Sequence, residues 1–385
     1  MHTERRSSPR CLPAFLHPTA SLCEEKRGAC ESKKGGKAQG LRVGAMQSSA
    51  KTSGASAKGS NAAGRWPGVF SVIESELSRV KTLIKKDLSD CGDPVRGLVA
   101  YANAGKGKMI RPGLVLLSGL ACGGVTEKHI RSAAIFEIIH NATLLHDDVV
   151  DEGKSRRGVP TVNSIHGNES AVLLGDFLLG RVIGMCVGLG DRVSEIIAVA
   201  AMRTCEGELR QISQRGNWLL SEPEYIEIIA GKTAALFEGA CATGAVLAGA
   251  DESTMQVLAS YGRNVGIAFQ ITDDLLDLVG EQDKTGKPAG NDLDRDKLTL
   301  PLIHLLKTAG EAEKKKIKQI LSQQNGDSGR MELVARLKTS GSIEYAKRRA
   351  EEFVGQAITA IAGVGNNKSR KSLVETARFI TSRTA

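Results

Sequence analysis

Apolar residues recur at steps of three and four along most of this chain, which is the spacing of an amphipathic helix. The stretch from Phe70 to Leu88 shows it first, through Ile73, Leu77 and Val80. We expect further helices over 126–150, 222–246 and 301–385, with breaks near Gly310, 325–326 and 366–367. No segment of useful length alternates with the period of a strand, and no tandem repeat is present. The pattern therefore predicts an all-α fold.

Residues 1–65 lack this periodicity and are rich in Ser, Gly, Lys and Ala. Such composition cannot bury a core, so we expect a disordered tail and a single helical domain over 66–385. Arginines and serines near the start resemble a transit peptide, but Glu4, Glu24, Glu25 and Glu31 argue against one. A true start at Met46 is a third explanation, and the sequence does not decide among them.

The net charge of +9 would suggest a nucleic-acid partner if it were spread over the domain. Twelve Lys and Arg residues and four acidic residues lie within 1–65, so the tail carries eight of these charges. The nearly neutral remainder predicts no nucleic-acid binding. No apolar run reaches eighteen residues. The nearest, Thr233 to Ala250, contains Glu238, so we predict a buried helix there and no transmembrane segment.

The eight cysteines show no Cys-x-x-Cys spacing. A zinc site and a disulfide framework both lack support in a chain of this length. Reduced thiols are typical of a cytoplasmic protein, which is our expectation. Import into an organelle is the alternative if the tail is a transit peptide.

Three carboxylates close the apolar run that begins at Ile138, namely Asp147, Asp148 and Asp151, which we call the first acidic motif. Asp147 and Asp151 are four residues apart, so they lie on the same face of a helix. Like charges at this spacing weaken a helix unless a cation compensates them. Mg²⁺ suits such oxygen ligands, and the arginine pair that follows suits a metal-bound diphosphate.

A second acidic motif, Asp273, Asp274 and Asp277, repeats the spacing after another apolar run. One acidic cluster is most often a solvated surface. Two copies embedded in apolar sequence are harder to explain in that way. Facing each other across a helical bundle, they would hold several Mg²⁺ ions and one diphosphate.

From about residue 66 to the C-terminus, the chain resembles the trans-polyprenyl diphosphate synthases. These enzymes join isopentenyl diphosphate head-to-tail onto an allylic diphosphate. Each motif is weak alone, but their order and spacing together are specific. The resemblance is carried by Gly107-Lys108, Arg111-Pro112, His140, both acidic motifs, Arg156-Arg157-Gly158, Gly231-Lys232-Thr233, Phe269-Gln270, Gly286-Lys287-Pro288 and Lys297-Leu298-Thr299-Leu300-Pro301.

The resemblance implies a fold, a metal and a set of roles. The fold would be an isoprenoid-synthase-type helical bundle around a central cavity, and the cofactor three Mg²⁺ ions per active site held by Asp147, Asp151 and Asp273. The residues expected at isopentenyl diphosphate are Lys108, Arg111, His140 and Arg157. Those expected at the allylic diphosphate are Arg156, Lys232, Thr233, Gln270 and Lys287. The six aspartates and Lys232 would be catalytic, and the protein a homodimer.

Product length is expected to depend on the residues that precede the first acidic motif. The growing chain should run along this helix toward its N-terminus. Short-chain relatives often carry a bulky aromatic residue four or five positions before the motif, whereas this chain has Ala142 and Thr143. The small pair predicts an open channel and a long product of about C35 to C45.

Competing functions differ in which motifs they need. A terpene cyclase would not need Lys108 and Arg111, and it would not need a second full acidic motif. A non-catalytic partner subunit usually loses one or both motifs. A short-chain farnesyl or geranylgeranyl synthase is opposed only by Ala142 and Thr143. The chain also departs from the family at Lys154, where an acid is usual, and at Asn291 and Asp296, where Lys and Gly are common.

Overall fold

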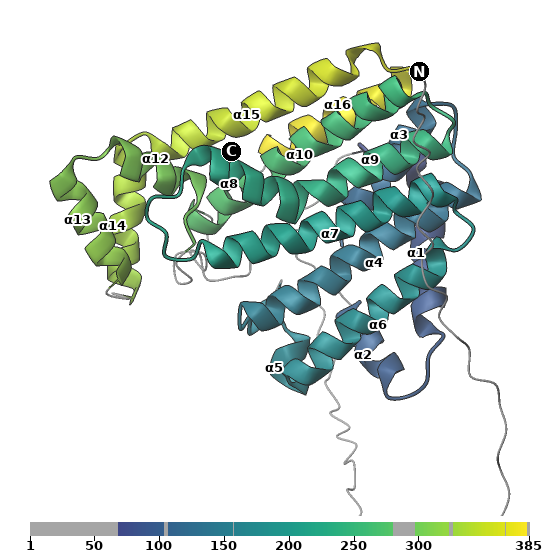
Figure 1. Ribbon diagram of the computed structural model, residues 1–385, viewed down its shortest axis with the longest axis horizontal. Helices are drawn as coiled ribbons and strands as arrows, with labels where there is room; N and C mark the ends of the chain where they lie inside the picture. The colour runs from purple at the N-terminus through teal and green to yellow at the C-terminus, as the bar shows by residue number, and fades with distance from the viewer. Residues whose placement is uncertain are drawn as a thin grey trace, which may run out of the picture. The chain divides into compact units, whose positions relative to one another are not determined.

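The computed structural model describes residues 68–103, 107–156, 158–279, 297–322, 326–365 and 367–382. All of them lie in one unit, Asn61–Ala385, and nearly all are helical (Figure 1). The predicted boundary between residues 65 and 66 lies outside the described residues. Within them, the all-α prediction is confirmed.

The first half of the unit contains η1 (Ser71–Ile73), α1 (Glu74–Ser89), α2 (Val95–Ala102), α3 (Ile110–Ala121), α4 (Glu127–Val150), α5 (Val162–His166), α6 (Asn168–Cys186) and α7 (Asp191–Ser213). The second half contains α8 (Glu222–Ile229), η2 (Ala230–Ala234), α9 (Ala235–Leu247), α10 (Glu252–Val279), α12 (Leu300–Thr308), α13 (Glu311–Ser322), α14 (Gly326–Thr339), α15 (Ser342–Ala360), η4 (Ile361–Gly363) and α16 (Asn367–Thr381).

Helix α4 is a central element of the bundle, where it packs against α3, α6 and α9 (Figure 1). Ile135, Phe136, Ile138 and Ile139 are fully buried on it or nearly so. The whole run 132–139 is buried, and successive residues of a helix point to different sides, so α4 is covered on all sides here. The first acidic motif therefore lies at the end of a helix that is fixed by its packing against several neighbours.

The N-terminus of α4 is fixed by a capping box. The Thr126 backbone N–H donates to His129 Nδ1 at 3.0 Å. His129 is fully buried, and its Nε2 lies 3.1 Å from the carbonyl oxygen of Gly244 on α9. This histidine satisfies polar groups on two helices at once, which locks α4 onto α9.

A short ribbon follows α4, made of β1 (Ser155–Arg156) and β2 (Val159–Pro160), which pair antiparallel. The sequence predicted no strand, and the ribbon is the exception within the described part of the chain. Strands of two residues are too short to show an alternating pattern. Gly158 turns between them with a φ of +76°, a conformation that favours glycine.

The apolar run from Thr233 is a buried helix, as predicted, since α9 is covered along nearly its whole length. Among the described residues, no helix is both long enough and apolar enough to cross a bilayer.

Candidate active site

The two acidic motifs lie at the C-terminal ends of α4 and α10. Asp147 and Asp148 belong to the last turn of α4, and Asp151 is its C-cap residue, whose N–H donates to the Asp147 carbonyl at 2.8 Å. Asp273, Asp274 and Asp277 lie in the last two turns of α10. Carboxylates at a helix C-terminus face the negative end of the helix dipole, so their charges need compensation from elsewhere.

Lys232 supplies part of that compensation for Asp147. Burial raises the pKa of Asp147 to about 6, Glu208 adds to this increase, and Lys232 opposes it. Lys232 lies on η2, where its Nζ is 2.5 Å from Glu208 Oε2 and donates to Gln211 Oε1 at 2.6 Å. Although burial disfavours its charge, Asp147 and Glu208 outweigh this effect and raise the pKa of Lys232. The lysine is thus held protonated beside the first acidic motif.

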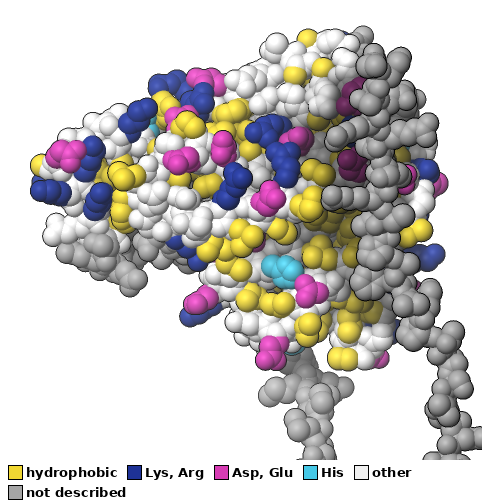
Figure 2. Space-filling view, in the orientation of Figure 1, with side chains coloured by type: hydrophobic (Ala, Val, Ile, Leu, Met, Phe, Trp, Pro, Cys, Tyr) yellow, Lys and Arg dark blue, Asp and Glu magenta, His cyan; other side chains and the backbone are white. Residues whose placement is uncertain are grey.

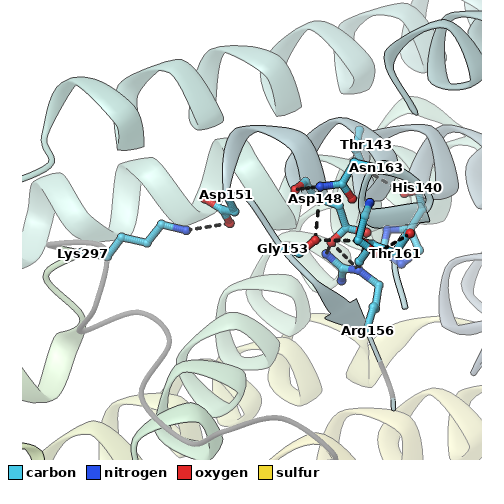
Figure 3. A network of polar contacts seen from close by, with 10 residues as sticks. His140, Thr143, Asp148, Asp151, Gly153, Arg156, Thr161, Asn163 and Lys297 are labelled. Carbon is cyan, nitrogen blue, oxygen red and sulfur yellow. Dashed lines mark hydrogen bonds and ion pairs between the residues drawn. The ribbon is translucent and has the colours of Figure 1, made fainter. Parts of the chain in front are cut away.

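Asp151 is held by two other cations. Arg215 donates from Nη2 to Asp151 Oδ1 at 3.1 Å, and Lys297 donates from Nζ to Oδ2 at the same distance. Figure 3 shows Lys297 reaching Asp151 from the segment that precedes α12. Each oxygen of this carboxylate therefore has a cationic partner.

Asp148 has a different surrounding and faces the ribbon (Figure 3). Its two oxygens accept three hydrogen bonds from Nε and Nη2 of Arg156, at 2.8 to 3.1 Å. Asn163 ties the same turn together, because its Nδ2 donates to the carbonyls of Asp148 and Gly153. The bidentate pair fixes the plane of the Arg156 guanidinium. Asp148 thus orients the arginine expected at the allylic diphosphate.

Asp274 of the second acidic motif is buried in a chain of hydrogen bonds. Tyr225 donates to its Oδ2 at 2.6 Å, and Gln270 donates to its Oδ1 at 2.7 Å. Gln270 in turn accepts from the hydroxyl of Thr233 at 2.5 Å. The chain links the predicted residues Thr233 and Gln270 to the second motif, through a tyrosine on α8.

Two neighbours on η2 therefore serve both motifs: Lys232 lies in the electrostatic surroundings of Asp147, and Thr233 leads to Asp274. This segment is a single turn of π-helix between α8 and α9. Such turns shift the side-chain register of a helix and occur often at functional sites. The predicted Gly-Lys-Thr motif thus connects the ends of α4 and α10.

Arg111 is buried near the start of α3, with its Cζ 4.8 Å from the centre of the Phe237 ring. Burial lowers the pKa of Arg111 to about 10, although Glu137 on α4 and Asp273 on α10 oppose this effect. It stays charged at neutral pH and lies within the field of the second acidic motif. Lys108, by contrast, is exposed.

The other predicted positions lie on α4 or outside the described residues. Ala142 is fully buried, while Thr143 is half-buried and donates to the carbonyl of His140 at 2.9 Å. Arg157 and Lys287 lie outside the described residues, as do Asn291 and Asp296.

The sequence did not identify Glu208, Gln211, Arg215 or Tyr225 as site residues. The spacing of Glu208 and Gln211 places them on one face of α7, which is a weak signal that many surface helices share. Nothing local marks Arg215 or Tyr225, because their acidic partners are distant in the sequence.

The donor set at the two motifs fits a hard divalent cation, since it consists of carboxylate oxygens. Within the described ranges, no three His, Cys, Asp or Glu side chains converge as a ready-made metal cage. Mg²⁺ commonly binds one or two carboxylates and takes its other ligands from water and substrate phosphates. The residues therefore fit an ion that binds together with a diphosphate.

A surface pocket of about 300 Å³ lies elsewhere, between α1, α4 and α6. Its polar lining is dominated by Asp87 and Arg181, which pair with each other at 2.9 Å. Because its charges are already paired and the acidic motifs are remote from it, we place the active site at the motifs.

Known proteins resemble this chain over most of its length. Residues 94–337 match the family model for polyprenyl synthetases. The chain is 35% identical to the octaprenyl diphosphate synthase of Escherichia coli, over 80% of this chain and 96% of that protein. It is also 35% identical to a short chain isoprenyl diphosphate synthase of Methanocaldococcus jannaschii, over 82% of this chain and 94% of that protein.

Solved structures show the same fold. A polyprenyl synthase from Caulobacter crescentus, complexed with calcium and isoprenyl diphosphate, superimposes with a TM-score of 0.79 and 33% identity. The match covers 82% of this chain and 97% of that one. The chain belongs to the polyprenyl synthetase family and is a prenyltransferase.

Proposed function

We propose that this protein is a Mg²⁺-dependent trans-polyprenyl diphosphate synthase that adds isopentenyl diphosphate to an allylic diphosphate. The observation that carries the proposal is the arrangement around η2. Lys232 lies beside the first acidic motif, and Thr233 is hydrogen-bonded toward the second. Positive charge and carboxylates thus meet where a metal-bound diphosphate would need both.

Cleavage of the allylic C–O bond leaves a diphosphate whose negative charge must be stabilised. Three Mg²⁺ ions bound by Asp147, Asp151 and Asp273 would supply charge neutralisation at this group. Lys232, Arg156 and Lys287 would add hydrogen bonds to the same oxygens. Arg156 is already oriented by Asp148, so little reorganisation is needed when the charge develops.

Isopentenyl diphosphate would bind on the opposite side, at Lys108, Arg111, His140 and Arg157. The position of Arg111 supports this assignment, because its guanidinium is buried in the bundle and stays charged beside Glu137 and Asp273, so a cation is already in place for this diphosphate. Holding the double bond next to the allylic carbon converts an encounter into a step within one complex. The released diphosphate is our candidate for the group that accepts the proton.

We infer a long product of about C35 to C45. The small size of the Ala142 side chain supports this inference, since a bulky residue at this buried position of α4 would obstruct the path below the first acidic motif. The identity values do not decide product length, because the octaprenyl synthase and the short-chain synthase are both 35% identical to this chain. A short-chain synthase therefore remains the alternative. A non-catalytic partner subunit is less well supported, because both acidic motifs are complete.

We also propose a homodimer that associates through α6 and α7. Large apolar side chains are exposed on these helices, where hydrophobic atoms gather in Figure 2. Leu173, Ile183 and Leu209 are 66%, 73% and 66% exposed. A surface this apolar is typical of an interface.

Product analysis tests the proposal. The full chain would be incubated with Mg²⁺, labelled isopentenyl diphosphate and farnesyl or geranylgeranyl diphosphate, and the products sized after dephosphorylation. A ladder that ends at seven to nine isoprene units would support the long-chain assignment. A ladder that stops at three or four units would favour the short-chain alternative. A folded protein that incorporates no label would favour the partner-subunit alternative.

A further inference from the structure

Arg215 lies in the turn between α7 and α8, outside every motif of the family resemblance. Its N–H donates to the carbonyl of Ile212 at 3.2 Å, and Gly216 continues the turn with a φ of +72°. The turn is tightened by Asn217, whose Nδ2 donates to Gln214 Oε1 at 2.6 Å. The backbone of the turn thus fixes the position of the Arg215 Cα atom.

From this turn the guanidinium reaches across to the end of α4. Its Nη2 is 3.1 Å from Asp151 Oδ1, and the two side chains are 31% and 14% exposed. Lys297 is at the same distance from Oδ2 and is 7% exposed. A cation that binds Asp151 therefore meets an oxygen that is already paired with Arg215 or with Lys297, and it competes with that ion pair.

A cation that binds Asp151 should displace Arg215 more readily than Lys297, because the two side chains differ in exposure. The Arg215 side chain is more exposed than that of Lys297, so it can move into water without leaving a buried charge unpaired. Because the Arg215 side chain is 31% exposed and that of Lys297 only 7%, breaking the Arg215 pair costs less than breaking the Lys297 pair.

We propose that Arg215 is a positioning residue that competes with the divalent cation for Asp151 and so sets the metal affinity of the first acidic motif. The inference rests on the proposed function, since it takes Asp151 as a metal ligand. Arg215 holds the Asp151 carboxylate in its present orientation, and it yields Oδ1 when the ion binds with its diphosphate. It therefore makes metal binding weaker than the carboxylates alone would allow.

Mn²⁺ titration of the full chain, followed by the electron paramagnetic resonance signal of the free ion, measures this effect. Arg215→Gln should lower the dissociation constant about two- to fivefold, the range expected when one partly exposed ion pair is removed. Arg215→Lys, which keeps the charge, should stay close to the wild type. The Mg²⁺ concentration that gives half-maximal activity should shift in the same direction as the Mn²⁺ constant.

Arg210→Gln is the matched control. Arg210 is a cation in the last turn of α7, five residues before Arg215, but it is 61% exposed and its acidic partner is Glu227, at 3.6 Å. Its loss changes the net charge equally without touching Asp151. If both glutamine variants lower the Mn²⁺ dissociation constant by the same factor, the effect comes from net charge and the proposal is wrong.

Unchanged or weaker Mn²⁺ binding in Arg215→Gln would also overturn it. Arg215→Met keeps the apolar stem in place, and it is the second variant if the first does not fold. Failure of the proposed function looks different. In that case the wild type would show no Mn²⁺ binding that depends on Asp147, and Asp147→Asn would behave like the wild type.

Discussion

At the scale of single residues, the site places charges where they are costly for the fold. Asp147 is buried enough to raise its pKa to about 6, and its neighbours include the acids Glu208 and Asp151. Such an arrangement does not maximise stability. It is understandable if a metal-bound diphosphate later compensates the charge.

Asp147→Asn should therefore stabilise the protein at neutral pH while abolishing activity. Because the folded-state pKa is raised, the stabilisation from protonating Asp147 is complete below about pH 4 and is lost as the pH rises through 6. In EDTA at pH 7.5 the variant should gain about 1–3 kcal/mol in the free energy of unfolding, and almost nothing near pH 4. Urea unfolding at both pH values measures this. An equal gain at both would show that the Asp147 charge is not responsible.

Tyr225→Phe should lower activity by removing a donor from buried Asp274. A hydrogen bond to a charged group contributes about 1.5–3 kcal/mol, so kcat/KM should fall about ten- to a hundredfold. Tyr345→Phe is the matched control, because Tyr345 donates to Glu222 at 2.5 Å, away from both acidic motifs. It should lose stability but little activity. Steady-state kinetics with the allylic substrate varied separates the two. Similar losses in both variants would argue against a special role for Tyr225.

At the scale of elements, η2 depends on a close approach by α7. A Cβ atom added at Gly207 would lie 2.0 Å from the Lys232 backbone nitrogen. Helices can come this close only where a side chain is missing. The glycine therefore decides where the π-turn and its lysine lie relative to the first acidic motif.

Gly207→Ala should separate α7 from η2, cost about 3 kcal/mol or more in stability, and displace Lys232. Gly355→Ala is the control, since it lies within α15 with no atom within 4 Å of the added Cβ. That variant should be neutral or more stable by up to about 1 kcal/mol, from the helix propensity of alanine. Thermal unfolding compares them. A Gly207→Ala protein as stable as the wild type would contradict the close contact.

Helix α4 also offers a test of product length. Ala142 is fully buried, five residues before Asp147. Ala142→Phe should shorten the products by filling the space below the motif, and Ala142→Leu should have an intermediate effect. Chromatography of the dephosphorylated products measures both. An unchanged ladder in the phenylalanine variant would place the limit on chain growth elsewhere.

At the scale of the whole molecule, exposed apolar side chains predict how two copies meet. Replacing Ile183 and Leu209 together by Glu should weaken the proposed dimer. Association would then bury the two introduced glutamates of each copy at the interface. Met331→Glu is the control, since Met331 is 73% exposed on α14, away from this surface. Sedimentation velocity at several concentrations distinguishes them. A double variant that associates like the wild type would place the interface elsewhere.

Much of the fold could be predicted from the sequence because helices are encoded locally. Apolar spacing predicted α1, α4 and α9, and the break near Gly310. The ribbon after α4 was missed, because two-residue strands have no period to detect. Both acidic motifs were likewise visible, since carboxylates four apart on a helix share a face whatever surrounds them.

The sequence by itself determined the helical class, the family and the position of both acidic motifs. Only the tertiary structure decided which cations those carboxylates face. Arg215 and Lys297 are 64 and 146 residues from Asp151, and Tyr225 is 49 residues from Asp274. No local periodicity relates positions so far apart, because the packing of whole helices brings them together. The aspartates in the sequence indicate the chemistry. The fold sets the pKa of Asp147, the orientation of the carboxylates and the cations that compete with metal for them.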